Sequence, residues 1–262
     1  MWMAWQKFDT TYKPGQKEAF KVSRSKIDQF LNCPRCFWLD RRLGIKQPSM
    51  PPFNINLAID ELLKKEFDTF RKAQKSHPYM TAIGLDAVPF EHPKLADWRH
   101  TFTGVEALHA PTNLMVFGAV DDLWVTTGGE VIVVDYKATA KDTPITGLGP
   151  VGGWQDTYRR QMEVYQWLLR ANGLQVSDTS YFVYANGRAS EKSFDEKVLF
   201  DVATFPYTGS DAWVEKTLIE LKSCLDADIP SVGNGAMGNG CEHCAYARSR
   251  TELTLRALQK NK

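Results

Sequence analysis

The 262-residue sequence lacks three features that would place it in a class at once. It has no uncharged apolar run close to the roughly 20 residues that span a bilayer. Its start, MWMAWQKFDT, has no basic segment followed by an apolar one, as a signal peptide would have. It has almost no net charge (+1), because 32 Lys and Arg residues are balanced by 31 Asp and Glu residues. We therefore expect a soluble, cytoplasmic protein without a membrane partner. A globally basic nucleic-acid binder is excluded, whereas a local basic groove is not.

The composition is that of a folded domain. Hydrophobic residues make up 43% of the chain and charged residues 24%, which permits a sizeable core. Disordered, collagen-like and coiled-coil classes are therefore excluded. At about 150 residues per domain, the length allows one or two domains.

Four of the five cysteines form two C-x-x-C pairs, CPRC and CEHC, near opposite ends of the chain. Two thiolates three residues apart can face one ion, and two such pairs complete a tetrahedral sulfur site. The alternative for each pair alone is a buried or redox-active pair of thiols. The expected ligands of one metal centre are Cys33, Cys36, Cys241 and Cys244. Cys224, in a helical stretch, is expected to be a core residue.

The spacing of apolar residues predicts alternating helices and strands. Helices are expected from Ser23 or Ser25 into CPRC, and over residues 54–72, 156–170 and 211–225. Strands are expected over residues 101–110, 113–127, 131–139, 180–187 and 197–205. Residues 1–22 show no clear period, and residues 77–100 are expected to be rich in loops.

Charged residues follow the apolar run VIVV in residues 131–139. Asp135 and Lys137 are two residues apart in a strand, so both project from one face. Asp121, on the neighbouring strand, can approach Asp135. Two carboxylates suit a hard divalent ion such as magnesium or manganese. The adjacent ammonium can hold the attacking water, which is the chemistry of phosphodiester hydrolysis. D-x-K is a weak motif alone, and its alternative is a solvated strand end with a casual ion pair.

Two helices supply further candidates. Gln161 and Tyr165 lie one turn apart on one face of the helix over residues 156–170. Asp60 shares an apolar helix face with Leu63 and Phe67, so its charge needs a partner. A metal would serve, and so would a buried Arg or Lys.

The motifs GAVDD, VVDYK and RRQMEVYQWLL, in that order, resemble the RecB-like branch of the PD-(D/E)XK nuclease superfamily. The pattern of that branch is G-x-x-D, D/E-x-K and Q-x-x-x-Y. VSRSKIDQFLNCPRCFWL resembles its opening segment, and CEHCAY resembles its closing cysteine segment. The resemblance covers residues 22–248 and is greatest to the CRISPR-associated RecB-like exonucleases and similar stand-alone nucleases.

The resemblance implies an α/β restriction-endonuclease-like core, with a mixed central sheet flanked by helices. It implies one nuclease domain over residues 1–262, in which residues 22–50 and 229–248 form a metal clasp and residues 54–186 form the catalytic core. The implied catalytic residues are Asp121, Asp135, Lys137, Gln161 and Tyr165. The implied magnesium or manganese ligands are Asp60, Asp121, Asp135 and Tyr136. The implied DNA-binding residues are Arg159, Arg160, Gln161 and Tyr165.

The sequence departs from the branch at two places. Asp60 stands where the branch often has a histidine, and Glu61, on a more exposed face, is its rival. Branch members with an iron–sulfur cluster usually have one N-terminal and three C-terminal cysteines, whereas this chain has two and two, with Arg250 at the usual last position. An iron–sulfur cluster is therefore expected, with zinc as the alternative.

These observations predict a metal-dependent DNA nuclease, an exonuclease that acts on ends or single strands. The alternative is a non-catalytic DNA-binding or assembly subunit of a repair or CRISPR adaptation complex, and proteins of those complexes are the expected partners. A redox-sensing cluster protein is a third, weaker interpretation. The complete set of Asp121, Asp135 and Lys137 favours the enzyme.

Overall fold

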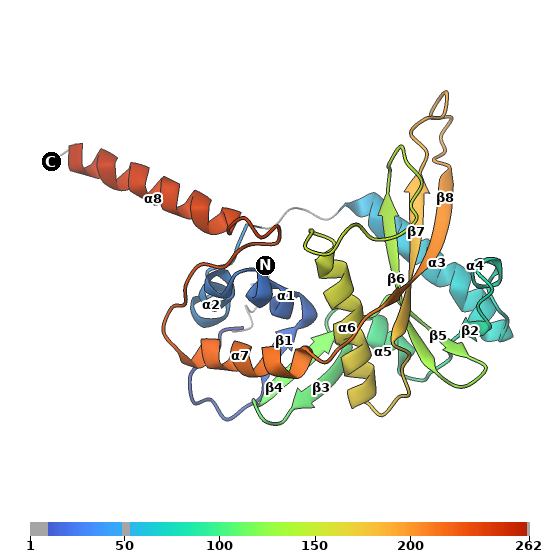
Figure 1. Ribbon diagram of the computed structural model, residues 1–262, viewed down its shortest axis with the longest axis horizontal. Coiled ribbons are helices and arrows are strands. Elements are labelled where there is room, and N and C mark those ends of the chain that lie inside the picture. The colour runs from blue at the N-terminus through green and yellow to red at the C-terminus, as the bar shows by residue number, and fades with distance from the viewer. Residues whose placement is uncertain (1–9, 49–52, 261–262) are drawn as a thin grey trace, which may run out of the picture.

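The computed structural model describes residues 10–48 and 53–260, so residues 49 and 50 of the expected clasp and both extreme ends of the expected domain lie outside it (Figure 1). The described helices are α1 (Arg24–Asn32), α2 (Pro34–Leu43), α3 (Asn54–Ala73), α4 (Pro78–Ala82), α5 (Leu95–Arg99), α6 (Asp156–Ala171), α7 (Val214–Asp226) and α8 (Glu242–Lys260). The described strands are β1 (Phe20–Ser23), β2 (Ala87–Pro89), β3 (Val105–His109), β4 (Leu114–Gly118), β5 (Asp122–Thr126), β6 (Val131–Thr139), β7 (Thr179–Gly187) and β8 (Phe200–Thr208). None of these helices has the length and apolar character needed to cross a bilayer.

The strands form two hydrogen-bonded sheets, in the orders β1-β4-β3 and β2-β5-β6-β7-β8. Each sheet is mixed, because β1 pairs with β4 and β6 pairs with β7 in parallel, whereas the other pairs are antiparallel. The expected α/β architecture with a mixed sheet and flanking helices is confirmed. The single strand expected over residues 113–127 is wrong, because the chain leaves one sheet after Gly118 and enters the other at Asp122. The apolar pattern continues across this break and hides it.

Alternate side chains of β6 belong to different parts of the core. Val133 lies in one buried cluster with Met162 of α6. Ile132 lies in another cluster with Phe67 of α3. The first six residues of β6 are all buried, as expected for a strand with a parallel neighbour and cover on both faces. The α6 face and the α3 face of this strand therefore carry separate sets of side chains.

Short elements and one long helix account for the errors of the sequence prediction. β1 lies in the segment where no period was visible, and α4, β2 and α5 lie among the loops of residues 77–100. Elements of three to five residues are too short to show a helical or strand period. α8 was not predicted, because its leucines do not form a buried stripe. The leucines of α8 are exposed, and the helix extends away from the rest of the chain (Figure 1).

The N-terminal part of the chain meets the end of α7 and the segment that follows it. Tyr12 donates a hydrogen bond of 2.6 Å to Asp226. Arg35 of α2 donates to the carbonyl oxygen of Pro230 at 2.9 Å, and Trp38 donates to that of Ala227 at 3.0 Å. These contacts place the N-terminal helices α1 and α2 against the segment that leads to α8, which brings the two cysteine pairs together.

Candidate active site and cysteine centre

The α6 face of β6 gathers the charged residues of the D-x-K motif. Asp135 is completely buried and forms an ion pair with Lys137 on the same face of the strand. Gln161 of α6 donates from Nε2 to Oδ1 of Asp135 at 2.7 Å. Its Nε2 also lies 3.3 Å from the hydroxyl of Tyr165, one turn further on. The structure thus brings all four residues into one connected group.

Asp121 lies where the chain crosses from one sheet to the other. Its Oδ2 accepts a hydrogen bond of 3.0 Å from the backbone amide of Tyr136 in β6. This contact holds the carboxylate of Asp121 beside that of Asp135. Gly118, three residues earlier, leaves space for the ring of Tyr165, because a Cβ at Gly118 would lie 2.6 Å from that ring. The glycine of the GAVD segment is therefore required by close packing against α6.

Asp60 approaches the same place from α3. One of its oxygens, Oδ2, accepts from Lys64 at 2.7 Å, whereas Oδ1 is buried without a hydrogen-bond partner. Burial and the nearby charge of Asp121 raise the pKa of Asp60. Glu61 is exposed and lies 3.6 Å from Lys65, outside this group. The unpartnered oxygen of Asp60 fits a cation ligand better than Glu61 does.

The electrostatics of the group depend on burial and on two neighbouring carboxylates. Burial raises the pKa of Asp135 to about 7, with Asp121 adding to this shift and Lys137 opposing it. Burial alone would lower the pKa of Lys137, but Asp135 and Asp121 raise it above its usual value. Lys137 therefore stays charged, and its ammonium lies 4.5 Å from the centre of the Tyr158 ring. Carboxylate oxygens in this number are a donor set for a hard divalent ion.

The remaining predicted site residues are arranged less simply. The hydroxyl of Tyr136 is on the α3 face, where it donates to Asp122 at 2.6 Å, so only the main chain of Tyr136 belongs to the site. Gln161 and Tyr165 are 8% and 3% exposed, which leaves little surface for direct contact with DNA. Arg159 donates to Asp156 and Arg160 donates to Asp28, both at 2.6 Å. A DNA phosphate would have to compete with these internal carboxylates.

Asp122 is the residue of this region that the sequence analysis missed. It is completely buried beside Asp121. Neighbouring residues near a strand point in opposite directions, so two adjacent aspartates cannot both face one site. The GAVDD segment therefore indicates that one aspartate points away from the site. Because a buried carboxylate needs a partner, this aspartate could have been predicted to pair with a cation elsewhere.

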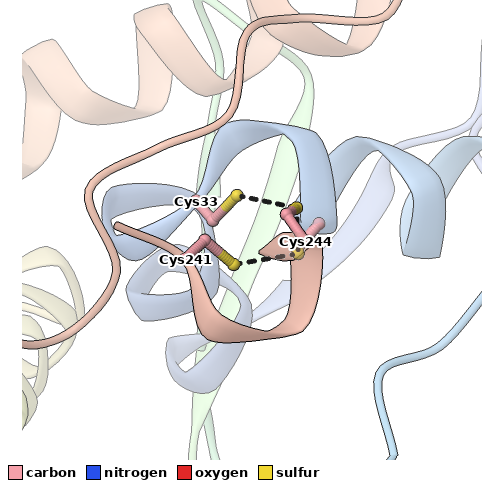
Figure 2. A group of neighbouring side chains, drawn as sticks. Cys33, Cys241 and Cys244 are labelled. Atoms are coloured by element: carbon pink, nitrogen blue, oxygen red, sulfur yellow. Dashed lines mark hydrogen bonds between the residues drawn. The ribbon is translucent and has the colours of Figure 1, made fainter. Parts of the chain in front are cut away.

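The four cysteines of the C-x-x-C pairs form a compact group (Figure 2). Their sulfur atoms all lie within 4.8 Å of one another, and in the part of the chain that the structure describes they are the only such group of three or more ligand side chains. The Sγ atom of Cys36 lies 3.5 Å from that of Cys241 and 3.4 Å from that of Cys244. The predicted meeting of the two pairs is confirmed, and Cys224 lies outside the group. The carboxylates are not gathered this closely.

Local backbone geometry supports the cysteine group. Gly233 donates its amide to Cys33 Sγ at 3.3 Å. Burial alone would raise the pKa of Cys33, but this amide, the amide of Cys36 and the thiols of Cys241 and Cys36 lower it, which favours a thiolate. A Cβ at Gly233 would lie 2.6 Å from the backbone of Asn32 and Cys33, so no larger residue fits there. Four buried or half-buried sulfur ligands suit zinc or an iron–sulfur cluster.

Comparison with known proteins places this geometry in a family. The sequence model of the PD-(D/E)XK nuclease superfamily matches residues 54–249. The chain belongs to the PD-(D/E)XK nuclease superfamily. The match includes all the candidate carboxylates, Lys137 and the second cysteine pair, whereas Cys33 and Cys36 precede it. Members of the superfamily are generally nucleases that use divalent metal ions, and DNA is the substrate that this nuclease fold implies.

Two further comparisons complete this description. Among solved structures, the crystal structure of SSO0001 is similar over 82% of this chain and 80% of that chain, with 15% sequence identity and a TM-score of 0.39. No curated protein matches the chain. The assignment of the PD-(D/E)XK superfamily therefore rests on the sequence match over residues 54–249.

Proposed function

We propose that this PD-(D/E)XK protein is a divalent-metal-dependent deoxyribonuclease, an exonuclease that hydrolyses phosphodiester bonds at ends or in single strands. The observation that carries the proposal is the ion pair of Asp135 and Lys137 on one face of β6, with Asp121 held beside it. The resemblance to RecB-like exonucleases supports action on ends. It also supports partners from DNA repair or CRISPR adaptation.

The residues of the site divide into ligands and positioning groups. Asp60, Asp121 and Asp135, with the main chain of Tyr136, would hold magnesium or manganese. Such an ion polarises a phosphate and lowers the pKa of an attacking water. The charged ammonium of Lys137 would orient that water by a hydrogen bond. Gln161 fixes the carboxylate of Asp135 through its 2.7 Å hydrogen bond, and Tyr165 supports Gln161.

DNA would approach the site along α6. Arg159 and Arg160 are proposed to bind phosphates by exchanging Asp156 and Asp28 for the DNA backbone. The aromatic ring of Tyr158 contacts the ammonium of Lys137, is half-buried and borders the site.

We propose that the four cysteines hold an iron–sulfur cluster, with zinc as the alternative. Anaerobic purification, elemental analysis and a visible spectrum distinguish the two. A brown protein with iron, absorbing near about 400 nm, identifies the cluster. A colourless protein with stoichiometric zinc identifies the alternative, and freely titratable thiols without either metal contradict both.

The nuclease proposal is tested by digestion of end-labelled DNA. Single-stranded and double-stranded DNA, labelled at either end, are incubated with the protein in magnesium, manganese or EDTA. Matched circular single strands distinguish the modes of attack, because an exonuclease leaves them intact. We expect metal-dependent release of nucleotides from linear DNA, and none from circles or in EDTA. DNA binding without cleavage in either metal would instead support the non-catalytic subunit.

A further inference from the structure

A second buried carboxylate lies directly behind the candidate active site. Asp122 is completely buried at the start of β5, on the α3 face of the five-stranded sheet. Its Oδ1 accepts hydrogen bonds from Arg71 at 2.5 Å and from Arg99 at 2.6 Å. Its Oδ2 accepts from the hydroxyl of Tyr136 at 2.6 Å. The carboxylate is fully engaged by the protein and has no role in the site as described so far.

Asp68 completes this group, which we call the Asp122 network. The network consists of Asp68, Arg71, Arg99, Asp122 and Tyr136. Asp68 accepts from Nε of Arg71 at 3.0 Å and from Nη1 of Arg99 at 2.8 Å. Two carboxylates therefore balance two guanidinium groups. Arg71 also donates to the carbonyl oxygen of Phe90, so its fork is held in several directions.

A network of this kind is a costly way to stabilise a core. Removing charges from water carries a large desolvation penalty, and well-packed apolar residues often stabilise a fold as well or better. Ionic networks instead fix the relative orientation of the elements that they join, because a guanidinium binds carboxylates only in defined planes and at defined distances. The Asp122 network is therefore better suited to fix geometry than to add stability.

The elements that the network joins are those that carry the candidate metal ligands. Arg71 lies on α3, about three turns after Asp60. Asp122 follows Asp121 directly, and Tyr136 follows Asp135 directly. The three ligand candidates lie on α3, directly before β5 and on β6, and Asp122 of β5 binds one residue of α3 and one of β6.

Tyr136 is the point where the network and the site touch. Its hydroxyl donates to Asp122, while its backbone amide donates to Oδ2 of Asp121 at 3.0 Å. One residue is thus held from both sides, between two adjacent aspartates of the preceding segment. A displacement of Asp122 would move Tyr136 and, through its amide, the carboxylate of Asp121.

We propose that Asp122 is a positioning residue, whose network sets α3, β5 and β6 at the spacing at which Asp60, Asp121 and Asp135 can share one divalent ion. The inference rests on the metal site of the proposed function and not on DNA cleavage. Asp122 itself touches neither the ion nor the substrate. Its loss acts on metal affinity and turnover through the ligands.

Asp122→Asn tests this role, because it keeps the size of the side chain and removes the charge. Binding of manganese is measured by calorimetry on protein with an intact cysteine centre, and kcat and KM are measured on linear DNA. We expect metal affinity and kcat each to fall by about tenfold or more, as for groups that orient metal ligands elsewhere, with KM for DNA unchanged.

Asp40→Asn is the matched control. Asp40 is also completely buried and is paired with Lys26 and Arg41, but it lies on α2, away from β5 and β6. It should lower the melting temperature in the same way as Asp122→Asn and leave manganese affinity and kcat at wild-type values. Tyr136→Phe is a milder second variant that removes one hydrogen bond and no charge. It should weaken manganese binding by about threefold, and it serves if Asp122→Asn does not fold.

The outcomes separate this inference from the nuclease proposal. If Asp122→Asn and Tyr136→Phe change only the melting temperature, as Asp40→Asn does, Asp122 is structural and the inference is wrong. A second outcome is that wild-type protein binds manganese and Asp122→Asn weakens this binding, but the wild type cuts no DNA. The positioning role then stands, while the nuclease proposal fails. If the wild-type protein binds no more manganese than Asp121→Asn, which lacks a candidate ligand, there is no metal site to position and the inference fails as well.

Discussion

The carboxylate site and the cysteine centre are built in opposite ways. The carboxylates lie on α3, on β6 and at the start of β5, around a core that packs on both faces of a sheet. The cysteines join segments that are 205 to 211 residues apart in sequence, beside the first turns of α2 and α8. The first arrangement is held by the core, and the second by contacts between the N-terminal helices and the segment that leads to α8.

The two sites also differ in how the protein itself compensates the charges of the ligand side chains. Asp135 has Lys137 and Gln161 as partners before any ion binds. The Cys36 thiol, by contrast, contacts the sulfurs of Cys241 and Cys244, and burial and the neighbouring cysteines raise its pKa. We therefore expect an ion to be an addition to the carboxylate site, and a metal to be part of the structure at the cysteine centre. The predictions below test this difference, from the largest expected effect to the smallest.

The sharpest test of the carboxylate site is loss of activity without loss of fold. Asp135→Asn and Lys137→Ala should each lower turnover by about 1,000-fold, which corresponds to about 4 kcal/mol in the barrier. Both variants should stay folded, with a cooperative unfolding transition in calorimetry. Full activity in both folded variants would contradict the assignment.

The cysteine centre should show the opposite behaviour. Cys33→Ser or Cys244→Ser should release the metal and lower the melting temperature by more than about 10 °C, since metal binding there is coupled to folding. Cys224→Ser is the control, because this cysteine lies outside the group. Metal analysis and thermal unfolding measure both effects. An unchanged melting temperature in metal-free protein would show that the chain ends meet without the metal.

Asp60 and Glu61 provide a test within one helix turn. Asp60→Ala should weaken manganese binding by about tenfold, because its buried oxygen has no other partner. Glu61→Ala should leave the affinity nearly unchanged, since this side chain is exposed. Calorimetric titration of both variants decides the matter. A larger loss for Glu61→Ala would reverse the order.

Gln161 and Tyr165 should have intermediate effects, because they act through Asp135. Gln161→Ala and Tyr165→Phe should lower turnover by several-fold to about tenfold. The melting temperature should change less than turnover does. A variant that loses stability alone would show that the Q-x-x-x-Y pair is structural in this chain.

The smallest effect concerns acid stability near the cysteine centre. Burial alone would raise the pKa of Asp40, but Arg41 and Lys26 lower it below its usual value. Such a group stabilises the fold above its unfolded pKa, near about 4, and this contribution is lost as the pH falls through the lower folded value. The difference in melting temperature between wild type and Asp40→Asn should therefore be largest near neutral pH and shrink below about pH 4. A difference that grows in acid would contradict this sign.

Local spacing predicted which residues of the candidate site share a face, and the family resemblance supplied their proposed roles. Asp135 and Lys137 share a face because they are two residues apart in a strand, and Gln161 and Tyr165 because they are one helical turn apart. The two cysteine pairs were predicted to meet because each offers half of a tetrahedral ligand set. In each case the chemistry of a short segment determines the outcome.

What the sequence could not reveal depends on partners that are distant along the chain. Nothing near Arg160 indicates that Asp28 binds it, 132 residues earlier. The break after Gly118 is invisible because apolar residues continue on both sides. Asp122 was overlooked because its cations come from α3 and α5, and only the folded sheet brings them behind Asp121.

Because α8 projects from the rest of the chain (Figure 1), its direction depends on the geometry of the cysteine centre at its base. The helix starts at Glu242, so Cys244 lies in its first turn, and its 19 residues extend for about 28 Å at 1.5 Å per residue. A tilt of about 10° at the base would move the far end of a rod of that length by about 5 Å. Small changes in the geometry of four sulfur atoms are therefore converted into large displacements of a distant, leucine-bearing surface. A metal bound by those sulfur atoms would therefore set the direction in which α8 points.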